Sequence, residues 1–136
     1  MKLSKNMSKN LLDTNLIIRF LVNDDILKVK KVEALLKDKN NTNILLDTIV
    51  AEIIWVLSSY YSLNKFEVIE KMRALIHVDT IDCNAVLINR ALTFWQDYNI
   101  SYIDSYLVAV ANLGNIPLFS YDEKLQSISS ITTREP

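Results

Sequence analysis

The scarcity of glycine and proline is the feature that most constrains the fold of this chain. One glycine and two prolines occur in 136 residues, whereas an all-β domain uses such residues at many tight turns. Long helical patterns therefore run uninterrupted, and they alternate with short apolar segments typical of buried strands. Because strands that alternate with helices usually form a parallel sheet covered on both faces, the sequence predicts a helix-rich α/β domain.

The hydrophobic pattern sets the expected order of elements. The candidate strands are Lys9–Asp13, Asn43–Asp47, His77–Asp82, Asn115–Ser120 and Ile131–Arg134. The candidate helices are Asn15–Asn23, a helix that starts at Asp24 and Asp25 and runs through Asp38, Ile49–Tyr61, Lys65–Ile76, Asn84–Tyr98, Ser101–Leu113, and a short turn over Asp122–Ile128. Thr48 and Asn64 are expected to cap helices, and Gly114 to stop one.

Length and composition predict one soluble domain. A chain of 136 residues buries about two thirds of its unfolded surface. The longest apolar runs, such as Leu107–Ala111, are far shorter than the roughly 20 residues of a spanning helix. The start, MKLSKNMSKN, is polar and lacks the apolar stretch of a secretory signal, so we expect a cytoplasmic protein. Residues 1–8 are a candidate flexible N-terminal extension, with Met7 as an alternative start.

The net charge of −1 and the pI near 5.8 argue against a protein that coats nucleic acid through bulk positive charge. A local basic surface is still compatible with these values. The segment Lys28–Lys39 would place most of its lysines opposite Val29, Val32 and Leu36 on a helix. An ordinary solvated helix face is the alternative interpretation of this segment.

Four carboxylates stand inside or beside apolar segments. They are Asp13 in NLLDTNLIIRFLV, Glu52 in TIVAEIIWVL, Asp104 in SYIDSYLVAVA and Asp122 in PLFSYDEKL. An ionised carboxylate taken out of water costs several kcal/mol unless a cation or hydrogen-bond donors compensate it. A shared cation would also offset the repulsion between clustered like charges.

Each acid also has a local structural explanation. Asp13 can cap the helix that it precedes, and Glu52 can be a helix-start acid. Ser101 with Asp104 matches a capping box, and so does Ser120 with Glu123, which would leave Asp122 as a first-turn acid.

The possible ligands decide which cation such a cluster would hold. His77 is the only histidine and Cys83 the only cysteine, so a zinc site of nitrogen and sulfur ligands cannot be assembled. His77 is expected to be a strand residue and Cys83 a small packing residue. Carboxylates with water suit Mg²⁺ or Mn²⁺, which bind phosphate oxygens and promote in-line displacement at phosphorus. This chemistry indicates phosphodiester hydrolysis.

The acidic motifs resemble those of the PIN-domain nucleases, and in particular the VapC-like ribonuclease toxins of bacterial toxin-antitoxin pairs. The matching pieces are LLDTNLIIRFL, IVAEIIWVL, YIDSYLVAVA and LFSYDEKL, in the family's order from Asn10 to about Leu125. The resemblance implies a single PIN-like domain over residues 1–136, a three-layer α/β/α fold whose mainly parallel central sheet has about four to five strands. It also implies a metal-dependent endoribonuclease that uses Mg²⁺ or Mn²⁺.

The resemblance further implies an acidic pocket formed by Asp13, Glu52, Asp104 and Asp122. Asp13 and Asp104 would be direct ligands of the ion. Glu52 and Asp122 would bind it through water, hold a second ion or orient the attacking water.

Neighbouring polar residues also match the family's motifs. Thr14 and Asn15 follow the first acid as in the family, and Asn15 would hydrogen-bond a pocket carboxylate. Ser120 matches the family's Ser or Thr two residues before the last acid, where it would position a water or phosphate, or else cap a helix. Asp47 begins a second DT pair but matches no family acid, so helix capping explains it. Arg19 and Lys31 are weaker candidates for contact with RNA phosphate or a partner.

The family implies partners as well: an RNA substrate, a second copy in a homodimer, and an antitoxin whose C-terminal segment blocks the pocket, with no membrane. A PIN-like interaction module without cleavage and an RNA-processing nuclease without a toxin role are the alternatives. An aspartyl phosphatase would need a second acid where Asn15 stands. A phosphoacceptor domain would need an acid pair where only Asp13 is found.

Overall fold

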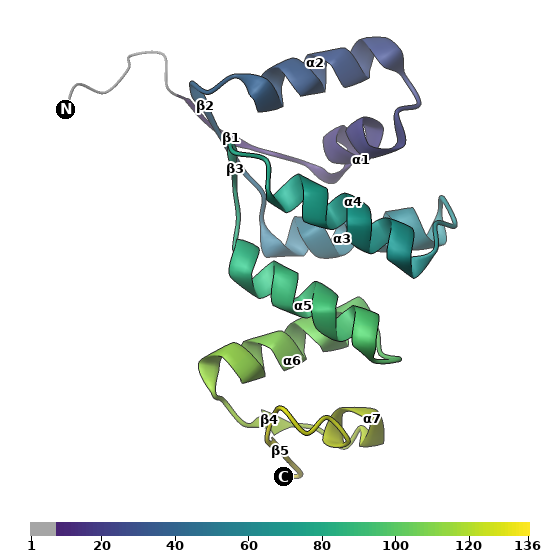
Figure 1. Cartoon of the computed structure of the whole chain (residues 1–136), viewed down its shortest axis with the longest axis vertical. Helices are drawn as coiled ribbons and strands as arrows, with labels where there is room; N and C mark the ends of the chain where they lie inside the picture. The colour runs from purple at the N-terminus through teal and green to yellow at the C-terminus, as the bar shows by residue number, and fades with distance from the viewer. Residues whose placement is uncertain (1–7) are drawn as a thin grey trace, which may run out of the picture. The chain divides into compact units, whose positions relative to one another are not determined.

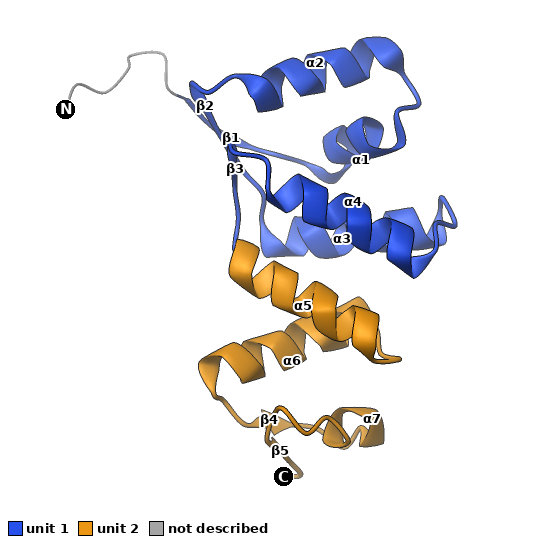
Figure 2. Cartoon of the chain, viewed as in Figure 1, with its two compact units in different colours: residues 1–84 blue, residues 85–136 orange. Residues whose placement is uncertain are grey.

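The computed structural model describes residues 8–136, and the chain divides into two compact units, residues 1–84 and 85–136 (Figure 2). The alternative start at Met7 and most of the candidate extension over residues 1–8 lie outside the described residues. Ser8, the last residue of that range, is the first residue of a strand.

The first unit is built on a three-stranded parallel sheet with the order β1-β2-β3 (Figure 1). The strands are β1 (Ser8–Leu11), β2 (Asn41–Ile44) and β3 (Ile81–Asp82), and the helices between them are α1 (Thr14–Val22), α2 (Ile26–Lys37), α3 (Asp47–Ser59) and α4 (Lys65–Ile76). Each crossover between neighbouring strands therefore contains two helices, as the parallel pairing requires a long connection.

Side-chain caps explain where three of these helices begin. Asp13 accepts a hydrogen bond from the Leu16 backbone N–H (2.9 Å), and Asp25 accepts one from the Lys28 backbone N–H (3.2 Å). Asn64 and Glu67 form a reciprocal capping box at the start of α4. The helix α3 differs, because it begins at Asp47 after Leu46 with no side-chain cap. The expected cap at Thr48 is therefore wrong.

Apolar residues at helical spacing form the core of the first unit. The helix α1 contacts α2 and α3, and α3 also contacts α4. The fully buried side chains include Ile17, Leu45, Ile53, Leu57 and Met72.

One buried polar side chain, Asn43 at the middle strand, links this sheet to its surroundings. Its Oδ1 accepts from Asn10 Nδ2 on β1 (3.1 Å), and its Nδ2 donates to Thr80 Oγ1 just before β3 (3.1 Å) and to the Leu35 carbonyl of α2 (3.4 Å). Asn43 has no exposed surface. These bonds satisfy polar groups that would be costly to bury unpaired.

The second unit contains a helical pair and a small parallel sheet. Its elements are α5 (Ala85–Asp97), α6 (Tyr102–Gly114), β4 (Leu118–Phe119), α7 (Glu123–Gln126) and β5 (Thr133–Arg134), with β4 paired to β5. The helices α5 and α6 pack together through buried side chains such as Leu92 and Val108. Asn115 follows α6 in the left-handed conformation (φ 51°). Gly114 is therefore the last helical residue, and Asn115 rather than Gly114 ends the helix.

The helix-rich α/β class with parallel strands is confirmed, with two differences from the prediction. The strands are shorter than expected, and the five strands of the described residues form sheets of three and two strands. His77 lies outside β3: it is the C-cap of α4, with its Nδ1 2.6 Å from the Arg73 carbonyl oxygen. No helix among residues 8–136 has the length and apolar character needed to cross a membrane.

The hydrogen bonds of Asn43 predict a stability effect. Asn43→Ala removes the donor to Thr80 and the acceptor for Asn10, so the free energy of unfolding should fall by about 1–3 kcal/mol. Urea denaturation followed by circular dichroism measures this change. The matched control is Asn40→Ala, which truncates an exposed amide three residues away and should change stability by less than about 0.5 kcal/mol. Equal effects of the two substitutions would contradict the assigned role of Asn43.

Candidate active site

Asp13 lies just past the carboxyl end of β1, where sites form in parallel sheets. Its side chain is exposed, while Leu12 and Thr14 on either side are buried. This carboxylate therefore lies at the surface, beside a buried segment. The Oδ1 atom caps α1, and the Oδ2 atom accepts no hydrogen bond from the described residues. One carboxylate oxygen thus remains available to a ligand.

Glu52 lies on α3, one position before the buried Ile53 and Ile54. Its side chain is exposed and forms no hydrogen bond or ion pair with the described residues. The helices α1 and α3 contact each other, so the two acids of the first unit belong to neighbouring helices.

Asp104 lies in the first turn of α6 and is half-buried. Its backbone N–H donates to the Ser101 Oγ (3.1 Å). This bond confirms half of the expected capping box. The return bond is not made, and the Asp104 carboxylate has no hydrogen-bond partner among the described residues.

Asp122 has a different local role from the one expected. It is the N-cap of α7 and accepts from the Lys124 backbone N–H (2.8 Å). Its own N–H donates to the Ser120 Oγ (3.0 Å), so the expected Ser120–Glu123 box is replaced by a tighter turn. Ser120 is held in turn by a backbone bond to Arg134 on β5 (3.0 Å). The helix α6, which carries Asp104, contacts β4, the strand that ends three residues before Asp122.

Two of the four acids lie in each unit: Asp13 and Glu52 in the first, Asp104 and Asp122 in the second. Within the described part of each unit, no three His, Cys, Asp or Glu side chains are placed to hold one ion. The four-carboxylate pocket therefore stays a prediction.

Two polar residues beside Asp13 differ in their surroundings. The Thr14 hydroxyl is buried and has no hydrogen-bond partner among residues 8–136. Asn15 is exposed and makes no side-chain hydrogen bond there. A buried hydroxyl without a partner is rare, and a bound water or ligand would satisfy it.

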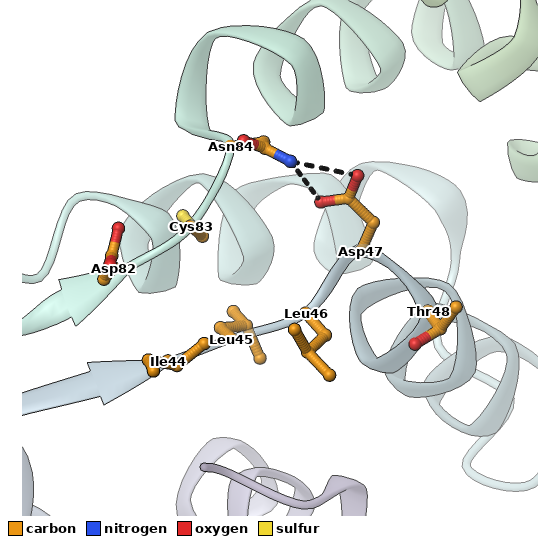
Figure 3. Close-up of a pocket in the computed structure, with 8 residues that line it drawn as sticks. All are labelled: Ile44, Leu45, Leu46, Asp47, Thr48, Asp82, Cys83 and Asn84. Atoms are coloured by element: carbon orange, nitrogen blue, oxygen red, sulfur yellow. Dashed lines mark hydrogen bonds between the residues drawn. The ribbon is translucent and has the colours of Figure 1, made fainter. Parts of the chain in front are cut away.

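A cavity of about 490 Å³ opens at the carboxyl ends of β2 and β3 (Figure 3). Asp47 and Asn84 face each other there, and the Asn84 Nδ2 donates to both carboxylate oxygens of Asp47 (3.1 and 3.2 Å). Asp47 therefore does not cap a helix, as was expected, but is a first-turn acid tied to a distant loop. The sequence analysis missed Asn84, because no local pattern links residues 37 positions apart.

Cys83 lines the same cavity, half-buried. Burial raises the pKa of its thiol, and the negative charges of Asp82 and Asp47 raise it further. All three causes disfavour the thiolate. The thiol is thus a weak nucleophile at neutral pH, in accord with the expected packing role.

Comparison with known proteins supports the resemblance. The family model described as the PIN domain matches residues 11–130. All four acids, together with Thr14, Asn15 and Ser120, lie inside this match. No curated protein matches the chain.

The charges around Cys83 predict how its reactivity depends on pH. Asp82→Asn removes one negative charge, so the thiol pKa should fall and alkylation by iodoacetamide at pH 8 should become faster, by a few-fold. The burial contribution remains, so the pKa should stay above its ordinary value. Asp79→Asn is the control, because Asp79 lies in the turn before β3 and is not among the causes that raise the Cys83 pKa. An unchanged rate in Asp82→Asn would exclude the electrostatic cause.

Proposed function

We propose that this chain, which belongs to the PIN domain family, is a metal-dependent endoribonuclease that hydrolyses RNA phosphodiester bonds. PIN domains are generally nucleases and typically use divalent metals. One observation carries the proposal for this chain: the PIN-domain match over residues 11–130 contains all four acids in the family's order. Each of them also keeps at least one carboxylate oxygen without a hydrogen bond to the described residues, so each is open to a ligand.

These acids fit a hard divalent ion. Mg²⁺ and Mn²⁺ prefer carboxylate oxygens and retain several waters, and the exposed carboxylate of Asp13 leaves room for such waters. When bound, the ion supplies a hydroxide nucleophile near neutral pH and stabilises charge on the entering and leaving oxygens.

The side chains would have different roles at the ion. Asp13 and Asp104 would hold the ion directly, while Glu52 and Asp122 would bind through water, support a second ion or orient the attacking water. Asn15 would hydrogen-bond a pocket carboxylate and keep its orientation. The Ser120 hydroxyl, which already holds the backbone of Asp122, would position a water or a phosphate oxygen.

The capping role of Asp13 makes a sharp test possible. Asparagine caps helices about as well as aspartate, so Asp13→Asn should preserve stability to within about 0.5 kcal/mol. The same substitution weakens the ion site, and RNA cleavage should fall by more than about a hundredfold. The measurement is cleavage of labelled RNA by purified protein, with Mg²⁺ or Mn²⁺ and with chelator.

The matched control is Asp25→Asn. Asp25 caps α2 in the same way but belongs to none of the four acidic motifs, so cleavage should continue. Metal-dependent cutting that survives Asp13→Asn would refute the ion site. No cutting by folded wild-type protein would favour the interaction module instead.

We further propose that the nuclease is the toxin of a type II toxin-antitoxin pair, that it acts in the cytoplasm as a homodimer, and that an antitoxin occludes its acidic pocket. The support is the VapC-like form of the four motifs, LLDTNLIIRFL above all. An RNA-processing nuclease with the same fold is the alternative function.

Induced expression in a bacterial host separates these two functions. The wild-type chain should arrest growth, because an unopposed endoribonuclease destroys essential RNA, and Asp13→Asn should not. Colony counts after induction measure the effect. Normal growth with a wild-type protein that cuts RNA in vitro would favour RNA processing.

A further inference from the structure

A second cavity of the first unit, of about 500 Å³, lies between α1 and α2 and reaches Asp13. Three cationic side chains line it: Arg19 on α1, and Lys28 and Lys31 on α2. The two lysines are one helical turn apart, so they face the same side of α2. Leu16 and Val32 also line the cavity and supply apolar surface. We call this cavity the basic cleft.

The cations of the basic cleft are available to a ligand. Lys28 and Lys31 are exposed, and their ammonium groups form no ion pair or hydrogen bond with residues 8–136. Arg19 pairs with Asp24 at 3.8 Å, but both side chains are more than 40% exposed (43% and 42%). Such an exposed pair contributes little free energy, so an anion can replace Asp24 at small cost.

We infer that the basic cleft binds backbone phosphates of single-stranded RNA next to the cleavage site, an inference that rests on the proposed function. The described lining contains three cationic side chains and one carboxylate, that of Asp13. Its excess of positive charge therefore favours an anion. A volume of about 500 Å³ is in the range of small-molecule sites and accommodates a nucleotide. No aromatic side chain among residues 8–136 lines it, so this part of the chain gives it no platform for stacking bases, and it would recognise phosphate rather than sequence.

The position of the cleft gives it a role in catalysis. Asp13 belongs both to its lining and to the proposed ion site. A strand whose phosphates contact Lys28 and Lys31 would therefore pass beside the ion. Arg19, Lys28 and Lys31 would act as positioning residues that bind the strand, not as residues that touch the reacting atoms.

The test compares two pairs of lysines on the same helix. Lys28→Gln/Lys31→Gln removes two charges from the cleft. Lys30→Gln/Lys37→Gln removes two charges from the opposite side of α2, where Lys37 pairs with Glu33. Both variants have the same net charge. Binding of a labelled single-stranded RNA is measured in chelator, so that no cleavage occurs, at several salt concentrations.

The double substitution Lys28→Gln/Lys31→Gln should weaken RNA binding about tenfold at low salt. It should also reduce the slope of the logarithm of the binding constant against the logarithm of the salt concentration by about 1.4, the value for two lost phosphate contacts on a single strand. The control pair should change neither quantity. Equal losses in the two variants would overturn the inference, because net charge alone would then explain binding. Loss of binding to a polyglutamate peptide with RNA binding intact would also overturn it, in favour of an acidic protein partner.

The binding and cleavage measurements together distinguish failure of the basic cleft from failure of the nuclease proposal. If Asp13→Asn abolishes RNA cleavage while the two lysine double variants bind RNA equally, the nuclease proposal is supported and the basic cleft is refuted. A selective binding loss in the cleft pair, with no cleavage by wild-type protein, would support the cleft and refute the nuclease.

Discussion

The first unit depends on the buried side-chain amide of Asn43. This one group contacts β1, the residue before β3 and the end of α2, so the sheet and its first crossover share a polar centre. A buried amide has fixed donor and acceptor directions, and a slip of one residue in any strand would leave its groups unpaired. The register that Asn43 favours also sets where β1 ends. Asp13 lies two residues after that end, so the same register determines its position at the edge of the sheet.

Helix capping and ion binding are compatible uses of one carboxylate. At Asp13 and Asp122, one oxygen accepts a backbone N–H at a helix start and the other makes no bond to the described residues. The cap fixes the side-chain rotamer, and a fixed rotamer lowers the entropy lost when a ligand binds. The structural and functional interpretations that the sequence left open for these acids are therefore not exclusive. Glu52 has no cap to make, so the described structure gives it no local role.

The sequence predicted what depends on local pattern. Helices such as Lys65–Ile76 were predicted correctly because apolar spacing and the Asn64 cap are local signals. His77 and Asp47 were assigned incorrectly, since their roles depend on where α4 ends and on Asn84, which is distant in sequence. The division of five strands into two sheets was also unpredictable, because strands of two residues carry no periodicity. Convergence of the four acids is a non-local property of this kind, so motif order supports it without demonstrating it.

The proposed ribonuclease activity raises an electrostatic problem. Carboxylates suited to a divalent ion repel the phosphates of the substrate, and a chain with a net charge of −1 offers no bulk attraction to offset that repulsion. Salt screens exposed charges beyond about 8–10 Å, so only cations close to the acids can help. Arg19, Lys28 and Lys31 line the same cavity as Asp13, so these cations lie on the side of the acid where a strand would approach. Nearly neutral proteins can bind RNA in this way when a few cations are concentrated beside the acids that repel it.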